Sequence, residues 1–377
     1  MIGTPFVQQA RRIVTREQRP LQPTFAVPNA PIMFARTLSI LALILIAAPV
    51  HAQGTKAEFI PALVGFWNIE NLYDTLDSPD TDDREFLPES GKLWGAQRYG
   101  RKVEKMGEVI AALGKDLDPR GVALLGLAEV ENRNVVEDLT RSTALKARGY
   151  QVVHTDSPDR RGVDVALIHD PKRYVVYAHK AYRLHMPDTA FRTRDQLLVS
   201  GVLDGDTTHV IVAHWPSRRG GEKRSMPNRM AAGELGRHIV DSLLARNPDG
   251  RILYMGDLND DPVNKSITMG LRATGDQAAA QGTTLFNPMH APFKKGIGSL
   301  AWRDSWNLFD QIIINPALVT GAGGRYRYFG TRVYNEPYLR QEEGNFAGYP
   351  KRTFVGDTYQ DGYSDHFPVY LILVRDK

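Results

Sequence analysis

The stretch RILYMGDLNDDP, residues 251–262, joins a strand pattern to an unusual group of polar side chains. Its apolar residues predict a buried strand that ends at Gly256, and three aspartates and an asparagine follow within five positions. Carboxylates this close repel one another unless something positive lies among them. The stretch therefore predicts a strand that ends in a functional site, whose other members must come from elsewhere in the chain.

Similar apolar runs recur along the chain, some adjacent in sequence and others separated by helical patterns. Helical periodicity covers residues 98–114, 135–147 and 228–246. Strand patterns cover residues 62–69, 121–130, 150–155, 162–169, 173–184, 196–203, 208–215, 251–256, 308–315 and 366–374. Neighbouring strands with helices between the others favour an α/β (α+β) fold of mixed sheets covered by helices. No repeat, linker or break in composition divides residues 53–377, so we expect one domain there.

The N-terminal part has the three regions of a secretory signal peptide. In MFARTLSILALILIAAPVHA, residues 33–52, one basic residue precedes an uncharged apolar run, and small residues precede a cleavage point. The alternative is an uncleaved anchor, but the run is shorter than the roughly 20 apolar residues of a membrane span. We therefore expect residues 1–32 to be an upstream extension, with translation starting at Met33, and the mature protein to be exported to the periplasm or secreted.

Removal of this segment changes the charge of the protein. Residues 1–52 carry five Lys or Arg and one acidic residue, which accounts for the entire formal net charge of +4. The basic pI is therefore no sign of a general nucleic-acid binder, and any attraction for phosphate must be local. Cysteine is absent, which excludes thiol chemistry and thiolate metal sites.

Polar residues gather where the apolar strands begin or end. Such positions can meet at one rim of a sheet, where α/β folds build their sites. Several carboxylates and amides supply the oxygen ligands that suit Mg²⁺ or Mn²⁺, with Ca²⁺ as a further possibility, and two histidines supply acid, base or charge stabilisation. The residues are Asn68, Glu70, Glu129, His214, Asp257, Asn259, Asp310, Asp365 and His366.

Other polar residues have simpler interpretations. We expect Asp260 and Asp261 to cap a helix that begins near Lys265, and Glu131 to be a solvated neighbour of Glu129. The acidic run 77–85 lacks the regular spacing of calcium ligands and is interpreted as a solvated loop.

Six motifs that contain these residues occur in a recognisable order. They are FWNIEN (66–71), LAEVEN (127–132), AHWPSRRGG (213–221), GDLNDDP (256–262), LFDQIIIN (308–315) and YSDHFPVY (363–370). Together they resemble the endonuclease/exonuclease/phosphatase superfamily, which has the deoxyribonuclease I-like fold, over residues 62–374. The resemblance implies a four-layer sandwich, in which two mixed β-sheets lie face to face and helices flank them.

The resemblance also implies roles for the histidines and for the residues that act on the phosphate. Asp257 would orient or deprotonate the attacking water, and Asn259 would hold a phosphate oxygen. His366 would contact the scissile phosphate with Asp310 holding its imidazole, and His214 would be the second histidine.

Four residues are implied at the metal ion. They are Asn68 and Glu129, with Glu70 as a helper and Asp365 nearby. Adjacent strand residues face opposite sides, so the meeting of Asp365 with His366 in one site is implied only by the resemblance.

The substrate is less clearly indicated. Gln311 stands where inositol-polyphosphate 5-phosphatases have arginine, which argues against that branch, and WNIENLYD (67–74) with FLPES (86–90) resembles an exported bacterial endonuclease-like branch. Arg218 and Arg219 begin a basic loop that we expect to bind a phosphate backbone, an interpretation favoured over the alternative of a solvated loop.

We therefore expect an exported endonuclease with nucleic acid as its substrate, no obligate protein partner and no stable membrane association after signal cleavage. A phosphodiesterase acting on lipid head groups or small phosphoesters is the alternative. A binding module that has lost catalysis is less favoured, since every motif position keeps a competent residue type.

Overall fold

The computed structural model describes residues 58–186, 191–321 and 323–377. The predicted upstream extension and signal peptide lie outside these residues. The described residues form one compact unit. Among the helices in the described part of the chain, none has the length and apolar character needed to cross a membrane.

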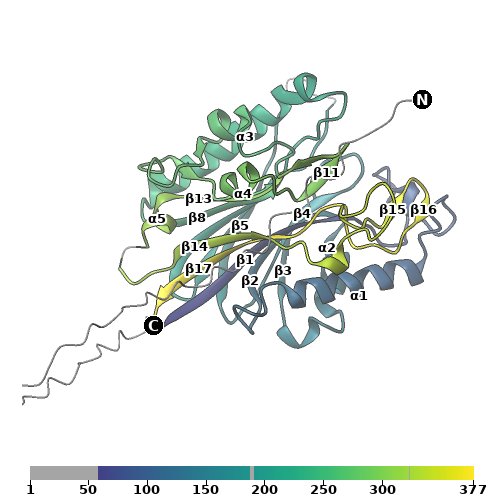
Figure 1. Ribbon diagram of the computed structural model, residues 1–377, viewed down its shortest axis with the longest axis horizontal. Coiled ribbons are helices and arrows are strands. Elements are labelled where there is room, and N and C mark those ends of the chain that lie inside the picture. Colours follow the sequence, from purple (N-terminus) through teal and green to yellow (C-terminus); the bar gives the residue numbers. More distant parts are fainter. Residues whose placement is uncertain (1–57, 187–190, 322) are drawn as a thin grey trace, which may run out of the picture. The chain divides into compact units, whose positions relative to one another are not determined.

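Two large mixed sheets dominate the structure (Figure 1). The first has the strand order β14-β17-β1-β2-β4-β3, and the second has the order β5-β6-β7-β8-β13-β10-β9. The strands of the first sheet are β1 (Phe59–Leu72), β2 (Val122–Val130), β3 (Gln151–His154), β4 (Asp164–His169), β14 (Arg327–Val333) and β17 (Val369–Asp376). Those of the second are β5 (Tyr174–Tyr182), β6 (Gln196–Leu203), β7 (Asp206–His214), β8 (Arg251–Asp257), β9 (Ala273–Thr274), β10 (Leu285–Phe286) and β13 (Asp310–Ile314).

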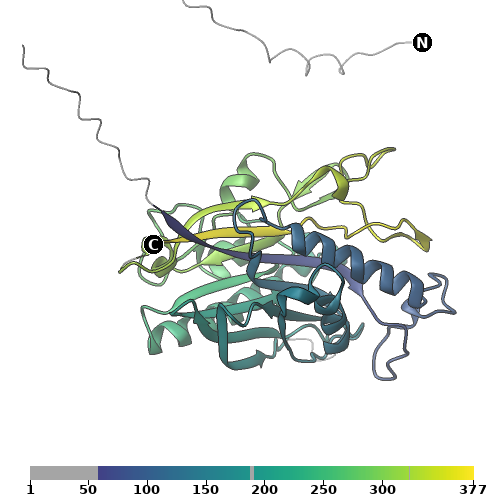
Figure 2. The same cartoon turned by 90° about the horizontal axis from the view of Figure 1, so that it is seen from below.

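The helices lie on the outer faces of the sheets (Figure 1), and Figure 2, seen from below, shows the long helix Ala96–Ala112 nearest to the viewer. α1 (Ala96–Ala112) and α2 (Arg133–Arg141) pack through Met106 and Leu139 on the first sheet. α3 (Glu222–Arg246) packs through Ile239 on the second sheet. Short helices are α4 (His290–Lys294), α5 (Pro316–Thr320), η1 (Arg84–Phe86), η2 (Lys146–Arg148), η3 (Ser266–Gly270) and η4 (Pro337–Leu339), and two hairpins are formed by β11 (Leu300–Trp302) with β12 (Ser305–Asn307) and β15 (Phe354–Val355) with β16 (Thr358–Tyr359).

The core between the sheets is made by inward-facing apolar residues of both. Val64 and Phe66 of β1 belong to the same buried cluster as Val212 of β7 and Met255 of β8. Burial of such side chains from water is the main favourable contribution to folding. The structure thus confirms the predicted α/β (α+β) sandwich of two mixed sheets flanked by helices.

Several predicted details are wrong, including the solvated position expected for Glu131, which is buried. The third long helix starts at Glu222 rather than residue 228, and the second ends at Arg141 rather than residue 147. The helix expected after Lys265 is the short segment η3, which has no side-chain cap. Asp260 instead forms an ion pair with the fully buried Arg229, with Nε and Oδ1 2.8 Å apart, and accepts a hydrogen bond from Ser266 Oγ at 2.6 Å.

Candidate active site

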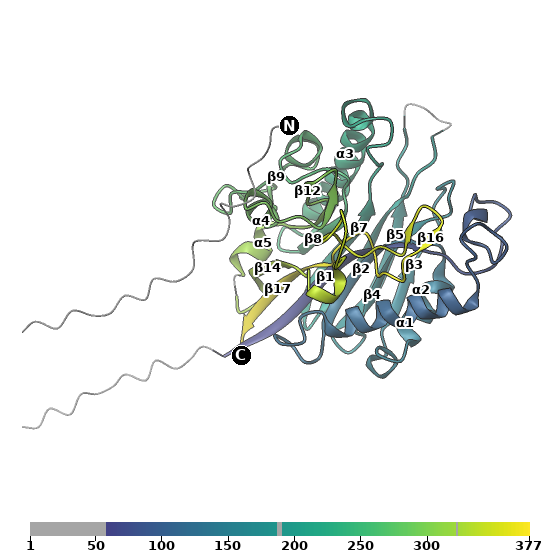
Figure 3. The ribbon, with the colours of Figure 1, turned by 45° about the vertical axis from the view of Figure 1, so that its right-hand side comes forward.

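The strand register of the second sheet places three predicted site residues side by side. β7 and β8 are parallel, which pairs His214 with Asp257 at their carboxyl ends. β13 is antiparallel to β8, which pairs its first residue, Asp310, with the same Asp257. All three side chains are buried. Asp257 is therefore the centre of a row at one rim of this sheet, and Figure 3 shows the strands β7 and β8 side by side.

The first sheet contributes residues from the carboxyl ends of the parallel strands β1 and β2. Asn68 reaches across to the second sheet, where its Nδ2 donates a hydrogen bond to Asp257 Oδ2 at 3.1 Å. Its Oδ1 accepts a bond from the backbone N–H of Glu70 at 3.0 Å. Glu129 Oε2 accepts a bond from the backbone N–H of Asn71 at 3.0 Å, and its Oε1 lies 4.0 Å from His214 Nε2. The site thus lies where the rims of the two sheets meet.

His366 completes this row from the segment just before β17. Its Nδ1 lies 2.6 Å from Asp310 Oδ2, and its Nε2 lies 3.9 Å from Asp257 Oδ2 and 4.0 Å from Asp365 Oδ1. Burial opposes the charge on the imidazole, but the three carboxylates outweigh it and raise the pKa of His366 well above its usual value. These surroundings therefore favour the charged imidazolium form of His366.

The other histidine has the opposite character. Burial and the positive charges of Arg194, Arg161 and His366 hold the pKa of His214 well below its usual value. Its Nε2 lies 3.5 Å from Asp257 Oδ2. The site therefore places a neutral histidine on one side of Asp257 and a charged one on the other.

Burial raises the pKa of Asp257 to about 6, with a further contribution from the negative charge of Asp310, although His366 and two hydrogen bonds oppose the shift. One of these bonds comes from the backbone N–H of Asn259 at 3.0 Å. A carboxylate with such a pKa is suited to accept a proton from water near neutral pH. The Asn259 amide itself is held by a bond from its Nδ2 to the carbonyl of Trp215 at 3.0 Å.

Asp365 joins the site although it is adjacent to His366 in sequence. Residues 364–368 precede β17 and are not part of a strand, so the alternation of strand side chains does not apply to them. Arg352 Nη2 lies 2.5 Å from Asp365 Oδ2, and its Nε lies 3.5 Å from Glu70 Oε1. Arg352 therefore links Asp365 to Glu70 from outside the row of the second sheet.

Several residues that no sequence pattern singled out support the site. The hydroxyl of Ser299 donates to Asp310 Oδ2 at 2.5 Å. The fully buried Lys102 donates to Thr353 Oγ1 at 2.6 Å, and the N–H of Thr353 donates to Glu70 Oε2 at 2.6 Å. Burial, followed by the charge of Asp365, raises the pKa of Glu70 to about 7. Each of these contacts joins segments from distant parts of the chain, except that between Ser299 and Asp310.

The two predicted phosphate-binding arginines have different surroundings. Arg218 donates to the backbone carbonyl of Asn259 at 2.9 Å and pairs with Asp260 at 3.0 Å, which ties its loop to the end of β8. Arg219 is exposed and lines a pocket together with Arg161 and Arg352. Phosphate binding by these two arginines stays a prediction. Arg219 is the more exposed of the two guanidiniums.

The carboxylate and amide oxygens at the rim are suitable ligands for a divalent cation. Glu129 is the strongest candidate ligand among them. Among the described residues, no lysine or arginine nitrogen lies within 4.0 Å of its carboxylate. Glu70 and Asp365 already share Arg352, and Asn68 offers an amide oxygen beside them. The imidazolium of His366 is no metal ligand, since a cation binds the neutral ring. The metal would therefore be held by Glu129, with Asn68, Glu70 and Asp365 around it.

The backbone is also unusual at this rim. Glu70, Asn71, Glu129 and Asn259 all have φ between 50° and 63°, in the left-handed region that side chains with a Cβ rarely occupy. Such conformations cost free energy and gather at functional sites, where the surrounding structure enforces them. Here they lie at or just beyond the ends of β1, β2 and β8.

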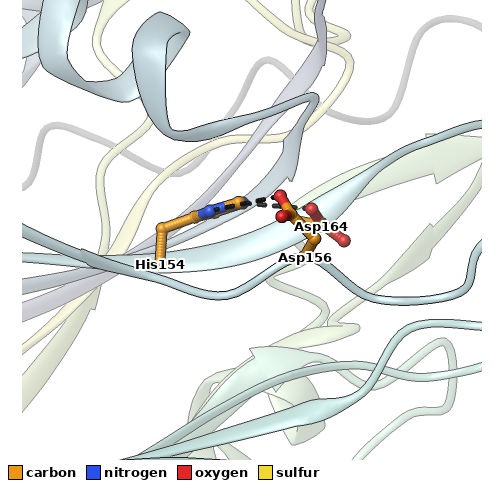
Figure 4. A group of neighbouring side chains, drawn as sticks. All are labelled: His154, Asp156 and Asp164. Carbon is orange, nitrogen blue, oxygen red and sulfur yellow. Dashed lines mark hydrogen bonds and ion pairs between the residues drawn. The ribbon is translucent and has the colours of Figure 1, made fainter. Parts of the chain in front are cut away.

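A second group of possible metal ligands lies apart from this rim. Figure 4 shows His154 and Asp164 with Asp156 beside them. His154 Nε2 lies 3.0 Å from Asp164 Oδ2, and the other carboxylate oxygen accepts a hydrogen bond from the N–H of Ser157 at 2.9 Å. These contacts close the turn between β3 and β4, which explains the group without a metal.

Comparisons with known proteins agree with this architecture. Residues 63–375 match the model of the Endonuclease/Exonuclease/phosphatase family. A search of curated proteins finds no match.

Solved structures share the fold at low sequence identity. TDP2 of D. rerio, complexed with a single-strand DNA product, is 12% identical over 83% of this chain and 98% of its own, with a TM-score of 0.50. A family protein of Bacteroides thetaiotaomicron is 15% identical over 85% and 100%, and a mannosyl-6-phosphatase of the same organism is 15% identical over 83% and 99%, both with a TM-score of 0.50. Since the family model covers most of the chain, the protein belongs to the endonuclease/exonuclease/phosphatase family.

Proposed function

We propose that the protein is an exported endonuclease that hydrolyses phosphodiester bonds of nucleic acid with the help of Mg²⁺ or Mn²⁺. Membership of the family supports metal-dependent phosphoester hydrolysis. The observation that carries the proposal is the position of Asp257 between a neutral histidine and a charged one, 3.5 Å from His214 Nε2 and 3.9 Å from His366 Nε2.

Different residues of the chain have different roles in the hydrolysis. Asp257 orients the attacking water and accepts its proton, which its pKa of about 6 allows near neutral pH. The imidazolium of His366 donates a hydrogen bond to the phosphate and stabilises the negative charge of the transition state. Asn259 holds a phosphate oxygen. A divalent cation held by Glu129 and its neighbours supplies charge neutralisation at the phosphate oxygens.

Two observations support nucleic acid as the substrate. The exposed Arg219 lies beside the site, and guanidinium groups are effective ligands of backbone phosphates. One protein of the same fold is TDP2 with a DNA product. The mannosyl-6-phosphatase of the same fold keeps a small phosphoester as the second candidate substrate.

The first test is nicking of supercoiled plasmid DNA by the purified protein in Mg²⁺. We expect nicking that is lost in EDTA and in His366→Ala, but retained in His238→Ala, which removes an exposed histidine of α3. Nicking that persists in His366→Ala would contradict the assigned role. Hydrolysis of small phosphoesters without nicking would contradict nucleic acid as the substrate and support a small phosphoester instead.

Export is proposed from residues 33–52 alone. Cell fractionation and N-terminal sequencing of the mature protein test it. We expect a chain that begins at Gln53 outside the cytoplasm, and a cytoplasmic protein that retains residues 33–52 would contradict the proposal.

A further inference from the structure

A polar pocket of about 470 Å³ opens beside the candidate active site. It shares Glu70 and Asn71 with that site, and its other walls come from Arg161, Arg219 and single residues of the segments 73–92 and 352–356. We call it the Arg161 pocket. Its position next to the metal-site residues means that a molecule bound at the site can extend into it.

The floor of the Arg161 pocket is rigid. The rings of Tyr73 and Phe86 are stacked, with centroids 4.4 Å apart and planes 13° from parallel. Behind them, Trp94 packs against Phe86 and Phe354 with centroid distances of 6.1 Å and 5.8 Å. The segment of residues 74–97 is thus anchored by an aromatic cluster and forms one wall of the pocket.

Most charged groups of the pocket already neutralise one another. Lys92 lies 2.8 Å from Glu85 and 3.3 Å from Asp357, and Arg352 pairs with Asp365. These cations are therefore poorly placed to attract a further anion.

Arg161 and Arg219 differ from these paired cations. The closest carboxylate to Arg161 is that of Asp159, with its Oδ1 3.8 Å from Arg161 Nε, and Arg219 has no ion pair within 4.0 Å among the described residues. Among the described residues neither guanidinium donates a side-chain hydrogen bond, so both keep this capacity for a ligand, although Glu129 and Asp159 attract the charge of Arg161.

The backbone that carries Arg161 is held by the pocket's own loop. Tyr73 Oη donates a hydrogen bond to the carbonyl of Arg161 at 2.7 Å, and the N–H of Asp82 donates to the carbonyl of Arg160 at 2.7 Å. Gly162 follows with φ of +71°, where a Cβ would lie 2.9 Å from Thr81. The guanidinium of Arg161 is therefore presented from a fixed turn.

We propose that the Arg161 pocket binds a second phosphate group of the substrate through Arg161 and Arg219. The proposal rests on the proposed function in that the first phosphate lies at Asp257 and His366. Planar guanidinium groups bind phosphate with paired, charge-assisted hydrogen bonds. The second phosphate belongs either to the next nucleotide of a polynucleotide or to a small bisphosphorylated compound such as a sugar bisphosphate, and the two sources share this chemistry.

Equilibrium binding in EDTA tests the pocket without requiring hydrolysis. Calorimetry would compare thymidine 3′,5′-bisphosphate with thymidine 5′-monophosphate, and fructose 1,6-bisphosphate with fructose 6-phosphate. In at least one pair we expect the bisphosphate to bind about tenfold tighter or more, equivalent to about 1.4 kcal/mol. The pair that shows the difference identifies the source of the second phosphate.

Arg161→Gln should abolish the preference for the bisphosphate. The matched control is Arg160→Gln, because this neighbour is also exposed and carries the same charge but does not line the pocket. Equal affinities within both pairs, or a preference that survives in Arg161→Gln, would overturn the proposal. Loss of activity in His366→Ala together with an unchanged preference would separate the pocket from the catalytic function.

Discussion

Asp310 Oδ2 lies 2.6 Å from His366 Nδ1 and accepts a hydrogen bond from Ser299 Oγ at 2.5 Å. Asp310 is fully buried, and its other oxygen has no hydrogen-bond partner among the described residues. One oxygen of Asp310 thus fixes both the orientation and the charge of the imidazole. His366 is prepared as a donor before any substrate binds, which avoids reorganisation during the reaction.

Asp310→Asn should lower kcat by about 10²–10³-fold, the cost of losing a positioned donor that stabilises transition-state charge. The amide keeps the shape but removes the negative charge, so the pKa of His366 should fall. Steady-state kinetics and an NMR titration of the His366 ring measure the two effects. Ser299→Ala is the control, since Asp310 keeps its charge and the loss of activity should be far smaller. An unchanged His366 pKa in Asp310→Asn would contradict this account.

Glu129→Gln should raise the Mg²⁺ concentration needed for half-maximal activity by about 10–100-fold, a range typical of disturbed metal sites. The amide still accepts the bond from Asn71 but has lost the charge that attracts the cation. Mg²⁺-induced stabilisation against heat should disappear with it. Glu131→Gln is the matched control, because Glu131 binds the N–H of Asp74 and the hydroxyl of Ser78 instead. Equal metal dependence in both variants would exclude Glu129 as a ligand.

Arg229→Met should destabilise the protein by about 3 kcal/mol or more, since removal of one partner leaves a buried charge without its counter-ion. Arg229 is fully buried beside Asp260, whose side chain is 2% exposed. Urea denaturation measures the change, with Arg224→Met, an exposed position of the same helix, as the control. Equal stability of the two variants would show that Arg218 alone neutralises Asp260.

Acid should loosen the contact between α1 and the loop that carries Arg352. A hydrogen bond from Arg101 and the charge of Lys105 lower the pKa of Asp361 from 3.8 to about 2. A depressed carboxyl pKa contributes stability above its unfolded value, and this contribution is lost as the pH falls from about 3.8 to about 2. Thermal melts across this window should therefore show a shallower decline in Asp361→Asn. A decline as steep as that of the unsubstituted protein would contradict the prediction.

The strand ends were predictable because apolar periodicity marks where a buried strand stops. The sequence placed His214 and Asp257 at such ends, and the parallel register of β7 and β8 brings them together. It could not say which strands are neighbours, so the pairing of Asp310 with Asp257 needed the structure.

Supporting residues from loops were not predictable from local pattern. Arg352 and Thr353 lie more than 280 residues from Glu70, yet both contact its carboxylate. The helix cap expected at Asp260 was a local interpretation, and the buried Arg229 of α3 overrides it. A local pattern also implied opposite directions for Asp365 and His366, which holds only inside a strand.

The positive φ angles of Glu70, Asn71, Glu129 and Asn259 lower the stability of the fold at positions where the side chains serve the site. Each costs on the order of 1 kcal/mol or more that glycine would not incur. A screen that selects only for heat resistance should therefore enrich glycine at Glu129 and so erase the predicted metal ligand. Variant libraries of this protein therefore need a selection for turnover as well as one for heat resistance. Otherwise the selected variants will be more stable but will lack the predicted metal ligand.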